Sequence, residues 1–292
     1  MITRVCLIGF GEVGQILAQD LAGAGVGDIA AYDTAFAEAG SAPSRALDGG
    51  PVRAAASAVE AVAGAELVVS AVTAAQDVEA ARAAAAGLAP GAFFLDLNSA
   101  SPGMKQQSAL LIEAAGARYV EAAVMSPIGP RRIASPMLLG GPHAAVFAEA
   151  AHGLGFTGAK VFSDVVGRAS ATKMCRSVVI KGIEALLTES MLAARSYGVE
   201  QPVLDSLSDL LPLPDWNATA RYMISRSLEH GARRAEEMRE AARTVGEAGV
   251  EPLMSLAVAQ RQDWAAGHLS ALSDDLAAML DTINTRIEGE AR

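Results

Sequence analysis

The sequence predicts an α/β domain with a mostly parallel sheet, followed by a long connecting helix and an all-α C-terminal domain. Over residues 1–165, apolar runs of strand length alternate with stretches of helical spacing, the pattern of strands joined by right-handed crossovers. After about Asp164 the strand signals stop and every further segment has helical spacing. We therefore expect two domains, residues 1–165 and residues 166–292.

The elements of the first domain are expected in near alternation. Pro102 stands near the start of one expected helix, where its missing N–H costs nothing. Apolar runs of strand length lie at 4–10, 28–33, 66–73, 92–98, 118–126, 136–141 and 159–163, and helical spacing is found at 14–25, 56–65, 74–90, 102–117 and 144–155.

The second domain is expected to open with one long helix between Gly167 and Gly198. Its apolar stripe is wide, so burial on most sides is expected. Further helices should follow at 202–211, in the charged stretch up to 250, at 251–267 and at 268–287, with a polar break at 212–217. The stripe comprises Ala171, Met174, Val178, Ile183, Leu186 and Leu187, widened by Val179 and Ile180.

Composition excludes several classes of function. The 292 residues are 51% apolar, enough for a sizeable core, and the formal charge of −10 argues against binding to nucleic acid or anionic lipid. Two cysteines without a CxxC motif or a histidine cluster argue against a disulfide framework and against a metal site. No apolar run reaches the length of a membrane span and no leader pattern opens the chain, so a cytoplasmic protein is expected.

A glycine motif follows the first expected strand. Gly9, Gly11 and Gly14 have the spacing G-x-G-x-x-G between a strand and a helix. The first glycine permits a tight turn, the second lets a pyrophosphate approach the backbone, and the third allows close helix packing. This context predicts a Rossmann-like dinucleotide-binding domain rather than a simple turn. The loop residues expected around the phosphates are Gly9, Phe10, Gly11, Glu12, Val13 and Gly14.

Asp33 ends the next expected strand. A carboxylate there accepts hydrogen bonds from the hydroxyls of an adenosine ribose and repels a 2′-phosphate, which favours NAD over NADP. Asp33 also suits a plain strand-end turn. Arg45 lies within reach of a 2′-phosphate in principle, so NADP stays open as the cofactor.

Four segments of the chain resemble the β-hydroxyacid dehydrogenase family, which includes 6-phosphogluconate and 3-hydroxyisobutyrate dehydrogenases. They are LIGFGEVG, VVSAVTAAQDV, DLNSASPGMKQ and GRASATKMCRSVVIKGIEALLTE. Their order and spacing match the family over nearly the whole chain, and the last two are the most specific. The C-terminal helical region is similar only loosely, as in a short branch of the family.

The resemblance implies roles for two loops. Val72 and Thr73 would line the cofactor, and Asn98 would lie near the nicotinamide ribose and the reacting carbon as a catalytic residue. Ser99 follows in the same loop and would face the substrate. The positions fit the physics, since ligands meet the carboxyl ends of the strands in a doubly wound sheet. The competing interpretation is that NSAS only caps the next helix.

Lys173 is the principal catalytic candidate. It lies near the start of the long apolar helix, where the expected polar face is small, so the side chain is expected to point into a cleft rather than into solvent. The matching lysine of the family contacts the substrate hydroxyl. In a desolvated site a neutral amine can take the hydroxyl proton as hydride leaves the same carbon.

The chain departs from the family at two substrate positions. The asparagine that the family carries four residues after the lysine is here Ser177, and its substrate loop V-S-G-G is here V-M-S-P. Pro127 has no N–H to offer a carboxylate. Ser126 retains a donor, and Met125, together with Ile128, indicates a more apolar substrate.

Basic residues of the helical domain form a further candidate group. Related enzymes supply a basic residue from this region, so His230 and Arg234 are expected substrate ligands, arginine by its fork geometry. The competing interpretation is a solvated charged face paired with nearby glutamates, which we favour for Arg233.

Together these features predict an NAD(P)-dependent dehydrogenase that interconverts a 3-hydroxy acid, or a related 3-hydroxy compound, with its 3-oxo form. Its partner would be a small-molecule substrate, and the resemblance implies a homodimer through the helical domain. Two alternatives stay open: a 3-hydroxy-amino-acid dehydrogenase or imine-reductase-like enzyme, and an inactive cofactor-binding regulator. Imine reductases resemble the family but lack the lysine, so Lys173 favours an alcohol substrate.

Overall fold

The structure is a computed structural model that describes residues 2–48, 50, 52–211 and 215–290. Part of the polar break expected at 212–217 therefore lies outside the described residues. The chain forms two compact units, Met1–Lys173 and Met174–Arg292. The division falls inside the long helix, after residue 173, so the first turns of that helix belong to the N-terminal unit.

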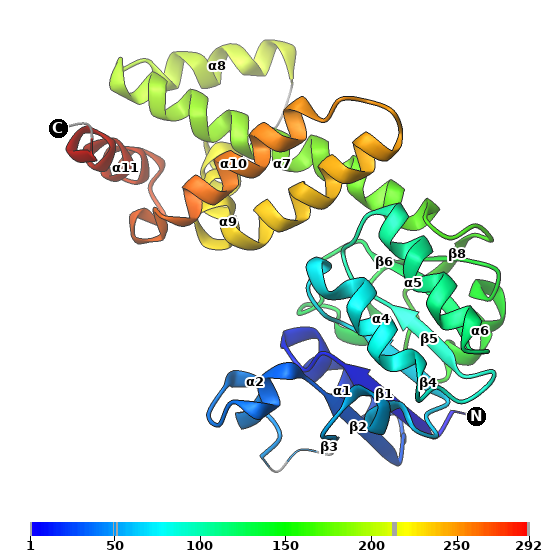
Figure 1. The fold of residues 1–292 in the computed structure, drawn as a ribbon. Helices are drawn as coiled ribbons and strands as arrows, with labels where there is room; N and C mark the ends of the chain where they lie inside the picture. Colours follow the sequence, from blue (N-terminus) through cyan, green and yellow to red (C-terminus); the bar gives the residue numbers. More distant parts are fainter. Residues whose placement is uncertain (1, 49, 51, 212–214, 291–292) are drawn as a thin grey trace. The chain divides into compact units, whose positions relative to one another are not determined.

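The N-terminal unit is built on one sheet (Figure 1). Within the described residues its strand order is β3-β2-β1-β4-β5-β6-β7-β8. Only β6 and β7 pair antiparallel, and the other neighbours pair in parallel. The strands are β1 (Arg4–Ile8), β2 (Asp28–Tyr32), β3 (Val52–Ala54), β4 (Leu67–Ser70), β5 (Phe93–Asp96), β6 (Arg118–Val124), β7 (Met137–Gly140) and β8 (Ala159–Ser163).

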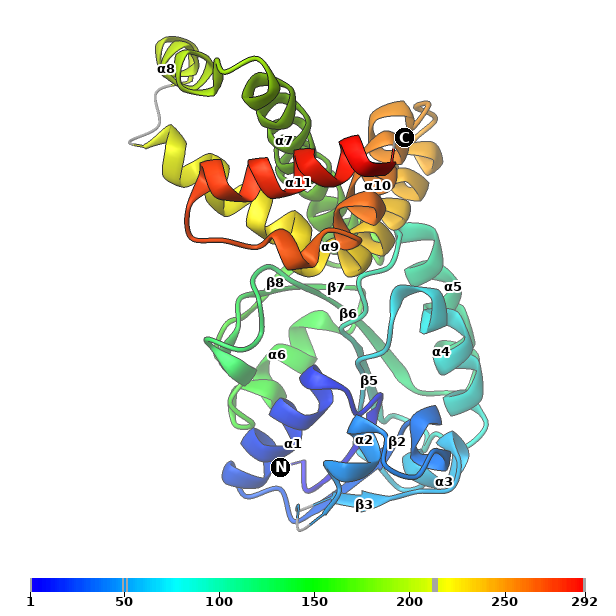
Figure 2. The same cartoon turned by 90° about the vertical axis from the view of Figure 1, so that its left-hand side faces the viewer.

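Helices cover both faces of this sheet (Figure 2). Alternate residues of each central strand point to opposite faces, so Leu7 packs with Leu17 of α1, while Cys6 packs on the other side with residues of α3 to α5. The unit is therefore a three-layer sandwich with two apolar cores. Its helices are α1 (Glu12–Gly23), α2 (Ala42–Arg45), α3 (Ala58–Val62), α4 (Asp77–Ala85), α5 (Pro102–Ala114) and α6 (Ala144–His152).

The second unit is helical. It comprises α7 (Arg168–Ser196) from Met174 onward, α8 (Glu200–Leu210), α9 (Trp216–Glu247), α10 (Leu253–Ala266) and α11 (Leu276–Glu290). The helix α9 is kinked at His230, whose φ of −125° and ψ of 15° are not helical. Next to the kink, a Cβ on Gly231 would overlap the carbonyl oxygen of Gln262, so α9 and α10 cross there at very close range.

The predicted fold class is confirmed, and the long helix runs almost between the two glycines expected to bound it. The expectation that this helix is buried on most sides is wrong for one face. Met174 and Leu187 are buried, but Val179, Ile180, Ile183 and Leu186 are exposed. A helix buries an apolar residue only where the chain supplies a partner, and the described residues supply none for this face.

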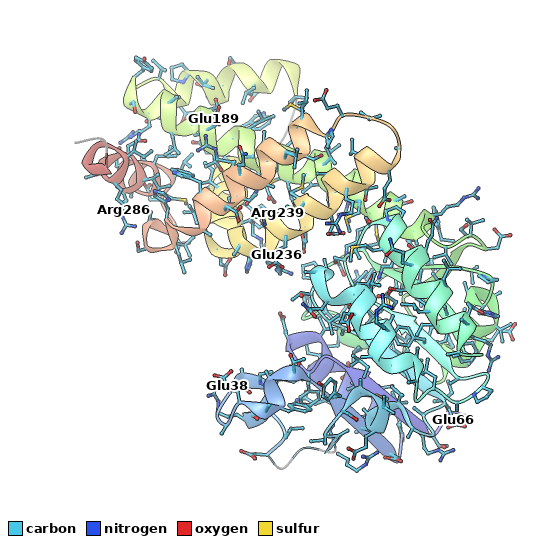
Figure 3. The ribbon with its side chains drawn as sticks, in the orientation of Figure 1. Glu38, Glu66, Glu189, Glu236, Arg239 and Arg286 are labelled. Carbon is cyan, nitrogen blue, oxygen red and sulfur yellow. The ribbon has the colours of Figure 1, made fainter. Side chains whose placement is uncertain are left out.

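Two short elements were not expected, β3 and α2. In both, every residue is exposed or half-buried and no apolar run is present, so β3 joins the sheet edge only by pairing with β2. Charged side chains lie on the surface of both units, among them Glu66 and Arg239 (Figure 3). Glu66 accepts hydrogen bonds from the backbone of Thr3 and Arg4, and Arg239 of α9 pairs with Asp263 of α10. None of the described helices has the length and apolar character needed to span a membrane.

Candidate active site

The glycine loop between β1 and α1 has the shape of a phosphate cradle. Gly9 has φ of +95°, a conformation that favours glycine, and a Cβ on Gly14 would overlap the carbonyl oxygen of Gly9. A Cβ on Gly11, in contrast, would meet nothing within 4 Å. Gly9 and Gly14 are therefore needed by the fold, whereas the space beside Gly11 is open.

The start of α1 completes this cradle. Gly11 is its N-cap and no side chain caps the helix, so the first N–H groups and the positive end of the helix dipole are left for an anion. Phe10 is buried and packs edge-on to Phe36, Val13 is half-buried, and Glu12 is exposed. The backbone rather than the side chains of the loop is thus available to the phosphates of a dinucleotide, and the loop fits that group.

Asp33 is tied to the glycine loop. Its Oδ2 accepts a hydrogen bond from the Phe10 N–H at 2.7 Å, and its Oδ1 accepts one from Ala35 at 2.9 Å as the cap of a 3₁₀ turn. Each carboxylate oxygen keeps a second lone pair. The half-buried carboxylate therefore has both the turn role and the acceptor capacity for ribose hydroxyls.

Asn98 braces the loops that follow β4 and β5. It is only 4% exposed, and its Oδ1 accepts the Val72 N–H at 2.7 Å. Its Nδ2 donates to Ser70 Oγ at 2.9 Å and to Asp77 Oδ1 at 2.7 Å. The amide thus uses both of its N–H donors inside the protein. These bonds make Asn98 a positioning residue, and its contact with the reacting carbon stays a prediction.

The structure brings Lys173 and Ser99 together. The Nζ of Lys173 donates to Ser99 Oγ at 2.7 Å across 74 positions of sequence, and both side chains are half-buried. The helix cap expected of NSAS is made by Ser101, whose Oγ accepts the Met104 N–H at 3.4 Å. Ser99 is thereby left to the lysine. Its loop continues the carboxyl end of β5, beside the brace that holds Val72 in the loop after β4.

A buried glutamate fixes the start of the helix that carries Lys173. Glu121 of β6 is fully buried, and its carboxylate accepts the N–H groups of Gly167 at 2.7 Å and Ser170 at 2.5 Å. A carboxylate at a helix N-terminus satisfies donors that the helix cannot satisfy and favours the helix dipole. Glu121 therefore anchors the first turn of α7 to the sheet, three residues before Lys173.

A second buried charge cluster lies under the same edge. Lys105 of α5 is 1% exposed and its Nζ is 2.5 Å from Asp96 Oδ1, while the Tyr119 hydroxyl donates to Asp96 Oδ2 at 2.7 Å. Burial alone lowers the pKa of Lys105, but the carboxylates of Asp77 and Asp96 outweigh it and raise that pKa. The lysine thus stays charged.

Sequence reasoning missed this cluster and Glu121. The only signal in the sequence is that Lys105, Asp96 and Glu121 stand among apolar residues, but helix and strand periodicity does not single them out. Burial of a charge requires a partner, and the partners here come from different elements.

The substrate loop after β6 is partly structural. The Met125 N–H donates to the Pro136 carbonyl at 2.9 Å, Ser126 Oγ donates to the Pro127 carbonyl at 3.2 Å, and Pro127 is exposed. Ile128 is different, because it is buried in the core beside α1. The expectation that Ile128 reports on the substrate is therefore wrong, and Met125, Ser126 and Pro127 remain the candidates.

Two candidate substrate residues of the helical unit make polar contacts within that unit. Arg234 pairs with the buried Glu184 of α7, and Ser177 accepts a hydrogen bond from Lys181 at 3.2 Å. Arg233 is exposed and lies 3.9 Å from Glu237, as in a solvated charged face.

His230 lies at the kink of α9. Its Nε2 is 3.3 Å from Glu229, and burial, with Arg226, lowers its pKa. The roles of Ser177, His230 and Arg234 toward a substrate stay predictions.

The chain is similar to known proteins over nearly all of its length. A family model described as the NAD binding domain of 6-phosphogluconate dehydrogenase matches residues 4–167, and a domain of unknown function (DUF1932) matches residues 194–265. A conserved hypothetical protein from Sinorhizobium meliloti 1021 is 34% identical, with 98% of this chain and 97% of that chain covered and a TM-score of 0.78. None of the curated proteins matches the chain.

Two further solved structures share the fold. One is a conserved protein of unknown function with structural similarity to 3-hydroxyacid dehydrogenases, 29% identical over 90% of this chain and 97% of that chain, with a TM-score of 0.71. The other is 3-hydroxyisobutyrate dehydrogenase of Mycobacterium tuberculosis with L-serine, 22% identical over 97% and 99%, also with a TM-score of 0.71.

The glycine cradle and these matches define an NAD(P)-dependent oxidoreductase. The chain belongs to the family that carries the NAD-binding domain of 6-phosphogluconate dehydrogenase, and its structural neighbours include 3-hydroxyisobutyrate dehydrogenase-like enzymes, as the sequence motifs indicated.

Proposed function

We propose that the protein interconverts a 3-hydroxy acid, or a related 3-hydroxy compound, with its 3-oxo form, with Lys173 as the general acid and base. The observation that carries this proposal is the hydrogen bond between Lys173 Nζ and Ser99 Oγ. It supports a proton-transferring group beside the loop at the carboxyl end of β5, the edge at which such sheets bind their ligands.

The residues of the chain divide the chemistry among them. A bound nicotinamide ring supplies hydride acceptance or donation. Lys173 as an amine takes the proton from the substrate hydroxyl, and as an ammonium it returns a proton to the forming alkoxide. Ser99 orients the lysine through the 2.7 Å hydrogen bond, Asn98 holds the two loops together, and Glu121 keeps the helix start in place.

NAD is the proposed cofactor. The Asp33 carboxylate has free lone pairs for two ribose hydroxyls and carries a charge that repels a 2′-phosphate. Arg45 is exposed and donates to the Gly40 carbonyl in the same chain segment, which supports a structural use of its guanidinium. NADP binding that equals NAD binding in affinity would contradict this preference.

A homodimer through the helical unit is part of the proposal. The exposed stripe of Val179, Ile180, Ile183 and Leu186 supports it, because apolar residues at one helix face are stabilised by a partner surface. Light scattering across a concentration series tests the mass. A monomer at all concentrations would contradict the proposal.

The test of the chemistry is a screen of 3-hydroxy acids and 3-hydroxy amino acids, followed by NADH and NADPH absorbance. Aliphatic and aromatic members belong in the screen, because Met125 and Pro127 stand where the family loop carries a serine and a glycine. With an active substrate, Lys173→Met should abolish turnover while NADH binding is retained. Lys160→Met, at an exposed lysine of β8, is the matched control.

The outcomes separate the alternatives. Turnover of an imine and not of an alcohol would favour the imine-reductase-like interpretation, and cofactor binding without any turnover would favour the regulator. Full turnover by Lys173→Met would refute the role of the lysine. Absence of NADH and NADPH binding would refute the whole proposal.

A further inference from the structure

Asp77 lies in a buried network that the proposed hydride chemistry does not use. It opens α4, is 1% exposed, and its Oδ1 accepts the Asn98 amide at 2.7 Å. Its second oxygen, Oδ2, accepts no hydrogen bond from any donor among the described residues. A buried polar atom without a partner is costly, so this carboxyl requires an explanation.

The surroundings of Asp77 decide its charge. Lys105 of α5 attracts it, Asp96 of β5 repels it, and the Tyr119 hydroxyl of β6 is turned to Asp96 rather than to Asp77. Burial first, and Asp96 in addition, raise the pKa of Asp77 to about 7 against the pull of Lys105. Glu121 adds negative charge near Lys105. A proton on Asp77, donated to the neighbouring Asp96 carboxylate, thus accounts for an oxygen that accepts no bond, because two carboxyl groups in hydrogen-bond contact share a proton rather than both ionising.

The charge of the network changes with that proton. Lys105 and Asp96 form an ion pair that cancels, so the cluster of Asp77, Asp96 and Lys105 is neutral when Asp77 is protonated and carries one negative charge when it is not. Through Asn98 the same cluster fixes the Val72 N–H in the loop after β4. In a doubly wound sheet this half, β4 to β6, holds the nicotinamide nucleotide of a dinucleotide.

We propose that Asp77 is a positioning residue that sets the relative affinity of the protein for the oxidised and the reduced nicotinamide cofactor, favouring the oxidised form when Asp77 is ionised. The inference rests on the nicotinamide cofactor of the proposed function. The oxidised ring carries a positive charge that the reduced ring lacks, so a buried negative charge on this side of the sheet stabilises the oxidised form selectively. The rest of the cofactor is the same in both forms.

The test is a binding measurement that needs no substrate. NADH affinity is measured by fluorescence and NAD⁺ affinity by competition, both between about pH 6 and about pH 8, the interval that brackets the Asp77 titration. The ratio of the two dissociation constants, Kd(NADH)/Kd(NAD⁺), should rise by about three- to tenfold over that interval, the effect of one partly screened charge. A titration that changes both dissociation constants by the same factor cancels in this ratio.

Two variants assign the effect. Asp77→Asn keeps an oxygen for the Asn98 amide but never ionises, so its ratio should stay level with pH. Glu79→Gln removes an exposed carboxylate two residues further along α4 and should behave as the wild type. A structural role alone would lower the affinity for both cofactor forms together and leave the ratio level in every protein.

Every outcome decides the inference. A wild-type ratio that does not change with pH overturns it, even if Asp77→Asn does not fold. An Asp77→Asn ratio that rises as in the wild type also overturns it. If neither cofactor form binds, the proposed function fails instead, so the two failures are distinguishable.

Discussion

Replacement of Glu121 by glutamine should destabilise the N-terminal unit through the start of α7. The carboxylate accepts two backbone N–H groups, from Gly167 and Ser170, in a fully buried position. A glutamine side chain in its place would offer one acceptor oxygen, so it can satisfy only one of these donors. Its NH₂ group, itself a donor, would face the other backbone N–H and leave it without an acceptor. The helix would also lose a negative charge at its positive end.

The magnitude follows from the bonds that are lost. A hydrogen bond to a charged acceptor contributes about 1.5–3 kcal/mol, and a buried donor left without a partner costs about 1–3 kcal/mol. We therefore expect Glu121→Gln to lower the free energy of unfolding by about 2–4 kcal/mol. For a domain of this size, that loss corresponds to a fall in Tm of about 5–15 °C.

Calorimetry and hydrogen exchange check this prediction together. The Tm should fall, and the amides of Gly167 and Ser170 should lose protection before those of the central strands. Glu149→Gln, at an exposed position of α6, is the matched control and should be neutral. Wild-type Tm and unchanged protection of both amides in Glu121→Gln would refute the anchoring role.

Three further predictions concern glycines and one acid. Gly11→Ala should leave Tm unchanged, because its Cβ meets nothing within 4 Å, yet it should weaken NADH binding at least about tenfold by blocking the approach of the phosphates. Gly14→Ala should lower Tm, because its Cβ would overlap the Gly9 carbonyl. Equal losses of Tm in the two variants would contradict this contrast. Folding raises the pKa of Asp77 to about 7, so the folded state retains a proton that the unfolded chain releases. The free energy of unfolding, measured with urea, should therefore fall from about pH 4 to about pH 7 and then level off. The fall should be less steep in Asp77→Asn. Gly231→Ala should destabilise the helical unit by about 1–3 kcal/mol, measured by urea unfolding, because α10 passes directly against that position.

Local patterns carry most of the fold prediction. The alternation of apolar runs with helical spacing depends on neighbours within a few residues, and so do the turn glycines, which explains why the strands, the long helix and the glycine loop were predictable. The same patterns cannot report whether an apolar face finds a partner. The outer face of α7 and the core position of Ile128 were therefore misjudged.

The site divides along the same line. The sequence by itself determined a mostly parallel sheet with a glycine loop typical of dinucleotide-binding domains, and its resemblance to family motifs proposed Lys173, Ser99 and Asn98 as candidates, since motif spacing survives without tertiary context. Only the tertiary structure decided that Lys173 meets Ser99, that Asn98 is a brace, and that Glu121 anchors the helix. A buried charge is defined by its partners, and those partners lie 46 to 74 positions away in the chain for Glu121 and Lys173, beyond the reach of any local pattern.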